Sequence, residues 1–224
     1  MTQAIKDEAL AQIQKEILLG FYDEATIAEI IQDLFYDVEN FDSDWLNAEI
    51  RKQFTHHQKT SQQWQKPTDF DRLVSVFDQL NKEKIVSLHR AGYTRQDAEG
   101  DCREIIDELS NLGIQAKGYC YYHTQDAERV MEEEVLFIGF DSVNFNDEVA
   151  LEIANRIIEL LQENNFQTSW NNSVETRIKI LNINWQKAYD GIDYNYNRVF
   201  SIIQKEHSPE KKEVSKKSFW KFWK

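Results

Sequence analysis

The spacing of apolar residues divides the chain into a helical first third and a mixed remainder. Over residues 1–66 the apolar side chains recur at helical intervals without a strand pattern, which predicts helices at about 3–19, 24–39 and 44–63. Beyond Pro67 the period of the pattern changes repeatedly between that of a strand and that of a helix. The chain therefore changes its architecture close to Pro67.

The part after Pro67 is expected to alternate between helices and strands. Thr68 and Asp71 have the spacing of a capping box, so a helix is expected to begin there. The elements that follow are expected at 85–89 (strand), about 95–111 (helix), 117–123 (strand), about 125–133 (helix), 135–140 (strand), about 147–164 (helix), 167–170 and 177–183 (a hairpin at the sheet edge) and about 186–204 (a closing helix).

This order of elements predicts an α/β (α+β) fold. It would have a mixed, mainly parallel sheet with flanking helices, preceded by an all-helical N-terminal segment. We expect a helical N-terminal segment (1–66), an α/β domain (67–204) and a disordered basic aromatic tail (205–224). The 224 residues are enough for one such domain with a helical extension.

Composition argues against several classes of protein. The net charge of -13 has the wrong sign for a protein whose main body binds nucleic acid. Two cysteines and five scattered histidines suit neither a disulfide framework nor a structural zinc site, and no cofactor is indicated. No apolar run reaches the length of a membrane span, and acids throughout the first residues argue against a signal peptide. A cytoplasmic protein is therefore expected.

Charge is unevenly distributed along the chain. Residues 16–50 contain ten acids and no Lys or Arg, whereas residues 208–224 contain six Lys and two Glu, which leaves -17 for the rest of the chain. Glu29, Asp33 and Asp37 fall on one face of the second predicted helix. Like charges at this spacing cost an isolated helix roughly 0.2–0.5 kcal/mol per pair. The face is either a contact for a basic protein or an ordinary solvated helix surface.

The carboxyl ends of the first two predicted strands bring polar residues to one edge. Parallel strands joined by right-handed crossovers end at the same edge of a sheet, where open α/β folds bind ligands. His89 and His123 end these strands. Each strand is followed by a helix, whose N-terminal N–H groups suit an anion or a polar small molecule. Alternation along the second strand places Tyr121 and His123 on one side and Tyr122 on the other.

The same residues also have structural explanations. Asp97 and Asp126 fall in the first turn of a helix, where capping alone accounts for an acid. His89 and His123 could be hydrogen-bonded histidines without a ligand. The chain has no GxSxG, GxGxxG, GxxxxGK or HExxH motif, and neither cysteine is placed for catalysis. No catalytic residue and no metal site is therefore assigned, and the sequence leans against an enzyme.

Four segments carry a resemblance to a known family. They read IVSLHRAGYTRQDAEGD, GYCYYHTQDAERV, VLFIGF and SWNNSVETRIKI, followed by the pair Trp185-Gln186. Over about residues 70–190 the sequence resembles a bacterial family known as domain of unknown function 6891. The resemblance implies a small α/β domain in the bacterial cytoplasm and no particular activity, and it leaves the helical first third and the tail outside. The polar residues that recur in the family correspond here to His89, Tyr93, Asp97, His123, Gln125, Asp126, Trp170 and Arg177.

The last nine residues combine four aromatic residues with four lysines. This composition is typical of a short peripheral membrane anchor, here at the inner membrane. A peptide docked in a partner's groove, a contact with single-stranded nucleic acid and a segment docked on the acidic block are the alternatives. The aromatic residues of this candidate contact are Phe219, Trp220, Phe222 and Trp223.

Three functions are compatible with these features. The leading hypothesis is a non-catalytic cytoplasmic protein whose acidic helices or tail bind another protein; an immunity-like role that masks a basic toxin is one form of it. The second is a small-molecule or anion-binding domain, or an enzyme, that uses the rim of strand ends. It requires one concave pocket formed by His89, Tyr93, His123 and Asp126. The third is peripheral membrane association through the tail.

Overall fold

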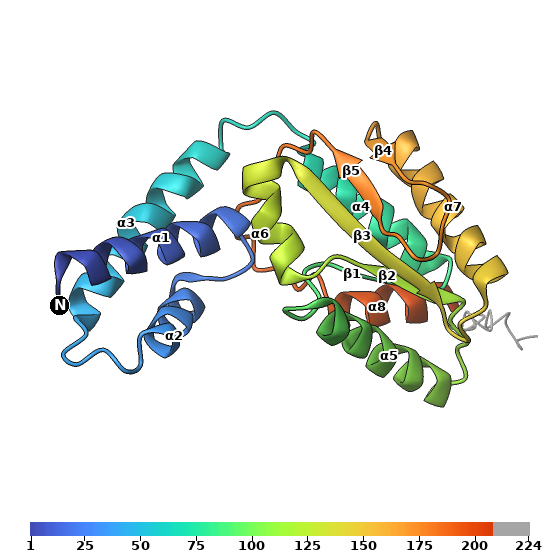
Figure 1. The fold of residues 1–224 in the computed structure, drawn as a ribbon, viewed down its shortest axis with the longest axis horizontal. Coiled ribbons are helices and arrows are strands. Elements are labelled where there is room, and N and C mark those ends of the chain that lie inside the picture. The colour runs from blue at the N-terminus through green and yellow to red at the C-terminus, as the bar shows by residue number, and fades with distance from the viewer. Residues whose placement is uncertain (208–224) are drawn as a thin grey trace, which may run out of the picture.

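The computed structural model describes residues 1–207, with a lobe of three helices at one end of the molecule and a five-stranded sheet with its helices beside it (Figure 1). The lobe consists of α1 (Gln3–Leu19), α2 (Glu24–Leu34) and α3 (Ser43–Ser61), so the all-helical N-terminal segment is confirmed. Its interior is a separate cluster of buried apolar side chains: Ala9, Ile13, Ile17, Ile27, Ile31, Phe35, Leu46 and Ile50.

Helix α2 ends at Leu34, earlier than the predicted 39. Phe35 turns inward, where it is 6% exposed and stacks on Phe41 with ring centroids 5.3 Å apart. In a longer helix Asp37 and Glu39 would lie in the last turn, where the negative end of the helix dipole disfavours acids. The packing of Phe35 and this repulsion together account for the early end.

The sheet has the strand order β1-β2-β3-β5-β4. Its strands are β1 (Ile85–Leu88), β2 (Gly118–Tyr121), β3 (Val135–Ser142), β4 (Gln167–Ser169) and β5 (Ile178–Leu181). Within the described residues only β1 and β2 pair in parallel; the β2–β3, β3–β5 and β4–β5 pairs are antiparallel. The α+β class, the mixed sheet and the edge hairpin are confirmed, whereas the prediction of a mainly parallel sheet is wrong.

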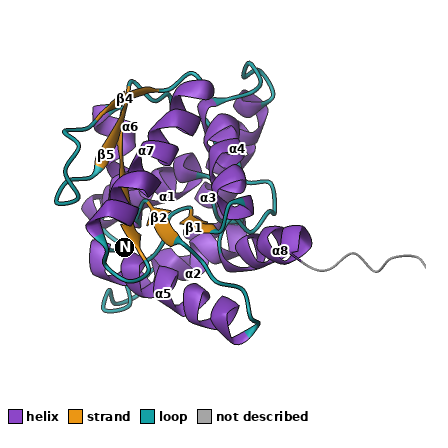
Figure 2. Ribbon diagram, turned by 90° about the vertical axis from the view of Figure 1, so that its right-hand side faces the viewer, coloured by secondary structure: helices purple, strands orange, loops and turns teal. Residues whose placement is uncertain are grey.

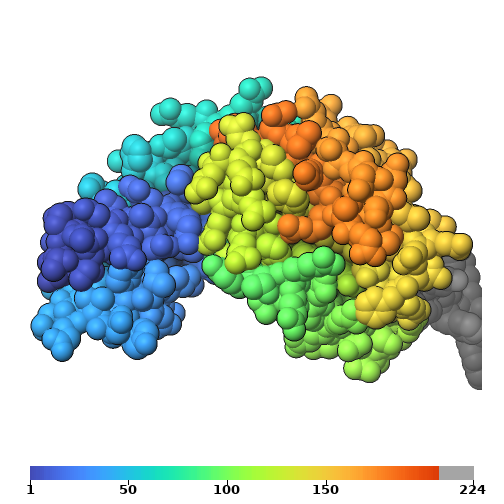
Figure 3. Space-filling model, viewed as in Figure 1, coloured from blue at the N-terminus to red at the C-terminus, as the bar shows by residue number. Residues whose placement is uncertain are grey.

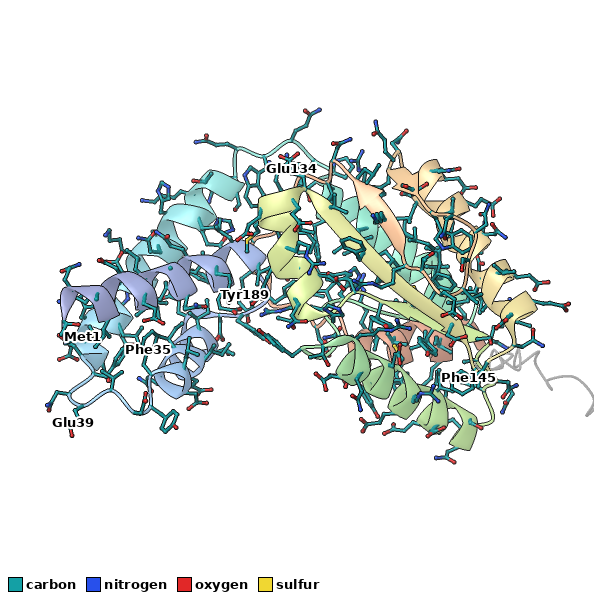
Figure 4. The ribbon with its side chains drawn as sticks, viewed as in Figure 1. Met1, Phe35, Glu39, Glu134, Phe145 and Tyr189 are labelled. Atoms are coloured by element: carbon teal, nitrogen blue, oxygen red, sulfur yellow. The ribbon has the colours of Figure 1, made fainter. Side chains whose placement is uncertain are left out.

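The direction of β3 follows from the short connection before it. Helix α6 (Thr124–Glu133) is followed by Glu134 alone, in the left-handed conformation with a φ of 53°, and β3 then begins (Figure 4). A parallel strand needs a crossover that returns the chain to the opposite edge of the sheet. Here the chain reverses at Glu134, so β3 starts at the edge where β2 ends.

Helices cover the sheet on both sides (Figure 2). Helices α4 (Asp69–Lys82) and α7 (Asp147–Glu163) pack on one face, and α5 (Arg95–Asn111) packs on β1 and β2 from the other. Tyr121 belongs to the apolar cluster under α5, whereas Tyr122 belongs to the cluster under α4 and α7. The predicted alternation of these two side chains is confirmed.

Residues 184–195 form an irregular strap that connects the sheet to the lobe. The Nε2 of His57 in α3 donates to the Lys187 carbonyl at 3.0 Å, and the Nε2 of Gln58 donates to the Tyr189 carbonyl at 3.0 Å. The strap therefore hydrogen-bonds through its backbone to the last helix of the lobe.

The closing helix begins later than the predicted 186. It is α8 (Tyr196–His207), which packs on α4 and β1. Before it, Gly191 adopts a φ of 73°, and the carboxylates of Asp190 and Asp193 each accept from the amide two residues further on. Such local bonds compete with the helix and favour turns, which explains the delay.

Candidate functional site

The loops that follow β1 and β2 lie side by side at one edge of the sheet. The amide of Ala91 donates to the Tyr122 carbonyl at 2.9 Å. Thr124 donates to the Gly92 carbonyl through both its amide, at 3.1 Å, and its hydroxyl, at 2.7 Å. The candidate residues that follow β1 and β2 therefore lie at one edge of the sheet.

His89 faces the side of the sheet opposite to His123. In the parallel pairing Leu88 lies opposite Tyr121, so the next residue, His89, shares the face of Tyr122. His89 is 1% exposed, and its Nδ1 lies 3.1 Å from the Tyr122 hydroxyl. Its Nε2 has no hydrogen-bond partner among the described residues. His89 is thus a buried histidine of the α4 side of the core.

We expect acid to destabilise the protein through His89. Burial lowers the pKa of His89 well below 6.5, and the charges of Arg198 and Lys187 lower it further. The unfolded chain takes up a proton there near pH 6.5 that the folded protein does not bind, so stability falls as the pH drops below that value. The loss is up to about 1.4 kcal/mol per pH unit.

Urea unfolding between about pH 7 and pH 5.5 measures this slope. The variant His89→Phe removes the titrating ring and keeps an aromatic side chain among the aromatic neighbours of His89. Its slope should be smaller by the His89 contribution. An equal slope in the two proteins would contradict a neutral, buried His89.

His123, Asp126 and Arg177 form a polar cluster at the rim. Asp126 is completely buried, and the Nη1 of Arg177 lies 2.9 Å from its Oδ1 and 2.8 Å from its Oδ2. His123 is the N-cap of α6: its Nδ1 accepts the Asp126 amide at 3.2 Å, and Asp126 Oδ2 accepts the His123 amide at 3.3 Å. A side chain from before β5 is thereby joined to the start of α6.

The two ring nitrogens of His123 face different partners. Nδ1 lies 3.2 Å from the Asp126 amide, whereas Nε2 lies 3.1 Å from Asp126 Oδ2 and 3.2 Å from Arg177 Nη1. Burial lowers the pKa of His123; Asp126 opposes this effect and the Arg177 guanidinium adds to it. The ring is therefore neutral at neutral pH, and the charges of Asp126 and Arg177 balance each other.

The other candidates lie around this cluster or away from it. Tyr93 is 56% exposed, Gln125 is exposed, and Asp97 is exposed and caps α5. Trp170 packs edge-on against Phe140 at 5.6 Å, and its indole N–H donates to two carbonyls of its own loop. Trp170 thus holds its own loop together.

The structure does not form the pocket that the rim hypothesis requires. His89 lies on one side of the sheet, whereas His123 and Asp126 lie on the other. Within residues 1–207 no three His, Cys, Asp or Glu side chains could hold a metal ion. Cys102 and Cys120 are buried, and burial raises the pKa of both thiols, which disfavours the reactive thiolate. Among the described residues, the rim therefore contains the ion pair of Asp126 and Arg177, and His89 is not part of it.

The acids singled out as a partner contact lie on the exposed side of the lobe. Glu29 and Asp33 lie on α2, whereas Asp37 lies in the turn after it, so the prediction of one helix face for all three is wrong. All three acids are exposed, and none of them has an ion-pair partner among the described residues. Leu34 and Tyr36 lie among them and are 54% and 86% exposed. The lobe projects from the rest of the molecule, which leaves this side open (Figure 3).

The aromatic tail lies outside the described residues. The expected contacts of Phe219, Trp220, Phe222 and Trp223 therefore stay predictions. Among the helices that the structure describes, none is long and apolar enough to cross a membrane.

The sequence pattern does not indicate that two cationic side chains are buried. Arg90 pairs with Glu16 of α1 at 2.9 Å, and Lys187 in the strap is 3% exposed. Lysine and arginine side chains are seldom buried, so both residues were expected to be exposed. Only the packing of the lobe against the sheet, which joins distant parts of the chain, encloses them.

Comparison with known proteins gives one match. A family model described as "Domain of unknown function (DUF6891)" matches residues 2–189. The match includes the helical lobe and so extends further than the resemblance over 70–190. No curated protein and no solved structure matches the chain.

Proposed function

The chain belongs to this family of domains of unknown function, and we propose that it is a non-catalytic interaction protein whose helical lobe binds a basic protein. The observation that carries the proposal is the exposed pair Leu34 and Tyr36 among unpaired acids. A solvated turn needs no aromatic ring at 86% exposure, which is that of Tyr36 in the turn after α2. Aromatic anchors surrounded by charges are typical of the centres of protein interfaces.

The charge of the lobe selects the partner. Glu29 and Asp33 repel each other as an i, i+4 pair on α2, and a Lys or Arg of the partner would remove that repulsion, which is roughly 0.2–0.5 kcal/mol. The chain outside residues 208–224 carries a net charge of -17. A basic protein would therefore also be attracted from a distance and associate faster. Leu34 and Tyr36 would then supply the apolar contact on which affinity depends.

An immunity-like role in a bacterial cytoplasm is one form of this proposal. A basic toxin masked by the acidic lobe would meet both requirements, namely opposite charge and an apolar contact. The membrane association of the tail and the ligand binding at the rim are separate hypotheses, which the lobe neither needs nor excludes.

A matched pair of variants tests the proposal. The lobe variant is Asp33→Asn, Tyr36→Ser and Asp37→Asn. The control is Phe145→Ser, Asp147→Asn and Glu148→Gln, since Phe145 is also a 61% exposed aromatic beside exposed acids, far from the lobe (Figure 4). Each full-length protein is used to retain partners from an extract of its source, and the partners are identified by mass spectrometry.

We expect the wild type and the control to retain the same basic protein and the lobe variant to retain at least about tenfold less, a difference of about 1.4 kcal/mol. Raising the salt from about 0.05 to 0.5 M should release it, because exposed charges are then screened. Equal retention by all three proteins, or a retained partner that is acidic, would overturn the proposal.

A further inference from the structure

The strap places the side chain of Lys187 inside an aromatic cage. The Lys187 Nζ lies 5.0 Å from the ring centroid of Phe21, 4.7 Å from that of Phe70 and 4.4 Å from that of Tyr194. Only 2% of the side chain is exposed. The three rings come from the connection between α1 and α2, from α4 and from the segment before α8. The cage therefore forms where these parts meet.

The backbone around Lys187 is held firmly on the lobe side. Its carbonyl accepts from His57 at 3.0 Å. Gly20, with a φ of 75°, closes α1 so near to the strap that an added Cβ would lie 2.4 Å from the Lys187 carbonyl oxygen. The side chain is thereby directed into the cage and away from solvent.

Among the described residues, the carboxylate that pairs with the amine is that of Asp190. Its Oδ1 is 3.6 Å away, beyond a normal hydrogen bond. Burial lowers the pKa of Lys187 to about 8; Asp190 and Asp71 oppose this effect and Lys66 adds to it. A fraction of the amine is therefore neutral near neutral pH, and a desolvated neutral lysine is a nucleophile.

A cavity of about 150 Å³, lined in part by Lys187, lies at the junction of strap and lobe, where Tyr189 lies (Figure 4). Besides Lys187 and Asp190, its lining includes Trp64, Asp71 and Tyr189. Since one water occupies about 30 Å³ of liquid, the cavity has room for a ligand of about five such groups. A compound of three or four carbons is of that size.

We propose that Lys187 is a covalent binding site for a small carbonyl compound, an aldehyde or ketone that it holds as an imine. Asp190 accepts one proton from the ammonium, which frees the Nζ lone pair to attack the carbonyl carbon while the π electron pair of the C=O bond moves to the oxygen. The oxygen then takes one proton from the added nitrogen and a second one back from Asp190, and it leaves as water as the nitrogen lone pair forms the C=N bond. The ammonium and the carbonyl compound thus become a protonated imine and one water, without an oxidant or reductant.

Reductive trapping tests the site on the full-length wild-type protein. The probe is propanal, and sodium cyanoborohydride fixes any imine as a propyl group. The labelling rate of every lysine is followed by peptide mass spectrometry after cleavage at Glu. Lys205, exposed on α8, is the reference lysine, and Lys187→Arg confirms the assignment of the labelled peptide.

At about pH 7.4 we expect Lys187 to be labelled at least about tenfold faster than Lys205, because an ordinary lysine is almost entirely protonated there. The Lys187 rate should level off above about pH 8, unlike the rate of the exposed reference lysine. Labelling of Lys187 at or below the rate of Lys205 would overturn the proposal, as would a Lys187 rate that rises in parallel with that of Lys205.

Discussion

Replacing Arg90 with methionine is expected to lower the free energy of unfolding by about 3–5 kcal/mol, because it leaves a buried carboxylate without its partner. The side chains of Arg90 and Glu16 are only 7% and 8% exposed and pair at 2.9 Å. The guanidinium also lies over the rings of Phe21 and Tyr22, at 5.5 and 4.7 Å. Methionine keeps much of the apolar contact and removes the charge, so the loss reports mainly on Glu16.

Urea unfolding of Arg90→Met against the wild type measures the effect. Arg95→Met is the matched control, since Arg95 pairs with Glu99 at 2.8 Å but is 64% exposed. The control should change stability by no more than about 0.5 kcal/mol. Equal effects of the two substitutions would show that the contact between lobe and sheet does not depend on this buried pair.

The variant Arg177→Met should lower the free energy of unfolding by about 3 kcal/mol near pH 8, because Asp126 is completely buried and its charge is then uncompensated. The deficit should be smaller near pH 6, by up to about 0.8 kcal/mol. Burial lowers the pKa of His123 and the Arg177 guanidinium lowers it further, so without Arg177 the pKa rises toward its unfolded value. A histidine whose folded pKa is lowered costs stability as the pH falls through its unfolded pKa, and the variant bears less of that cost than the wild type.

The comparison of pH 6 with pH 8 separates this coupling from simple loss of packing. Lys179→Met is the control. Like Arg177, Lys179 lies over the Phe137 ring, at 5.3 Å, but it is exposed. Its effect should be below about 1 kcal/mol and independent of pH. A deficit of Arg177→Met that is the same at both pH values would contradict the effect of the Arg177 charge on the pKa of His123.

Signals that span a few residues predicted the local structure well. The capping boxes of Thr68 with Asp71 and Thr94 with Asp97 form as their spacing indicates. Helix positions in the lobe also follow the apolar period. These features depend on contacts within one helical turn, so the sequence contains all the information that they need.

Features that depend on distant parts of the chain could not be predicted in the same way. The predicted bounds already left one residue between α6 and β3, but the direction in which α6 leaves the sheet depends on its packing against α1 and β3. The register of β1 against β2 places His89 and His123 on opposite faces, and no pattern within either strand contains that register. The two histidines lie at the same edge of the sheet, which suggested a single site, but their side chains lie on opposite faces of the sheet.

Buried charges were the least predictable part. Arg90 and Glu16 are far apart in the sequence, and Lys187 is enclosed by rings from three elements. A charged side chain predicts exposure, and only tertiary packing can reverse that expectation. All three residues lie where the lobe meets the sheet.

We propose above all that the lobe binds a basic protein through its acidic, apolar side. Site-specific photocrosslinking tests this claim most directly. A photoreactive phenylalanine analogue is placed at Tyr36 and, in a second protein, at Phe145, and both are irradiated in cells of the source organism. We predict a crosslinked complex with one basic protein from position 36 and none with that protein from position 145. The same crosslinked proteins from both positions, or no complex from position 36, would contradict the claim.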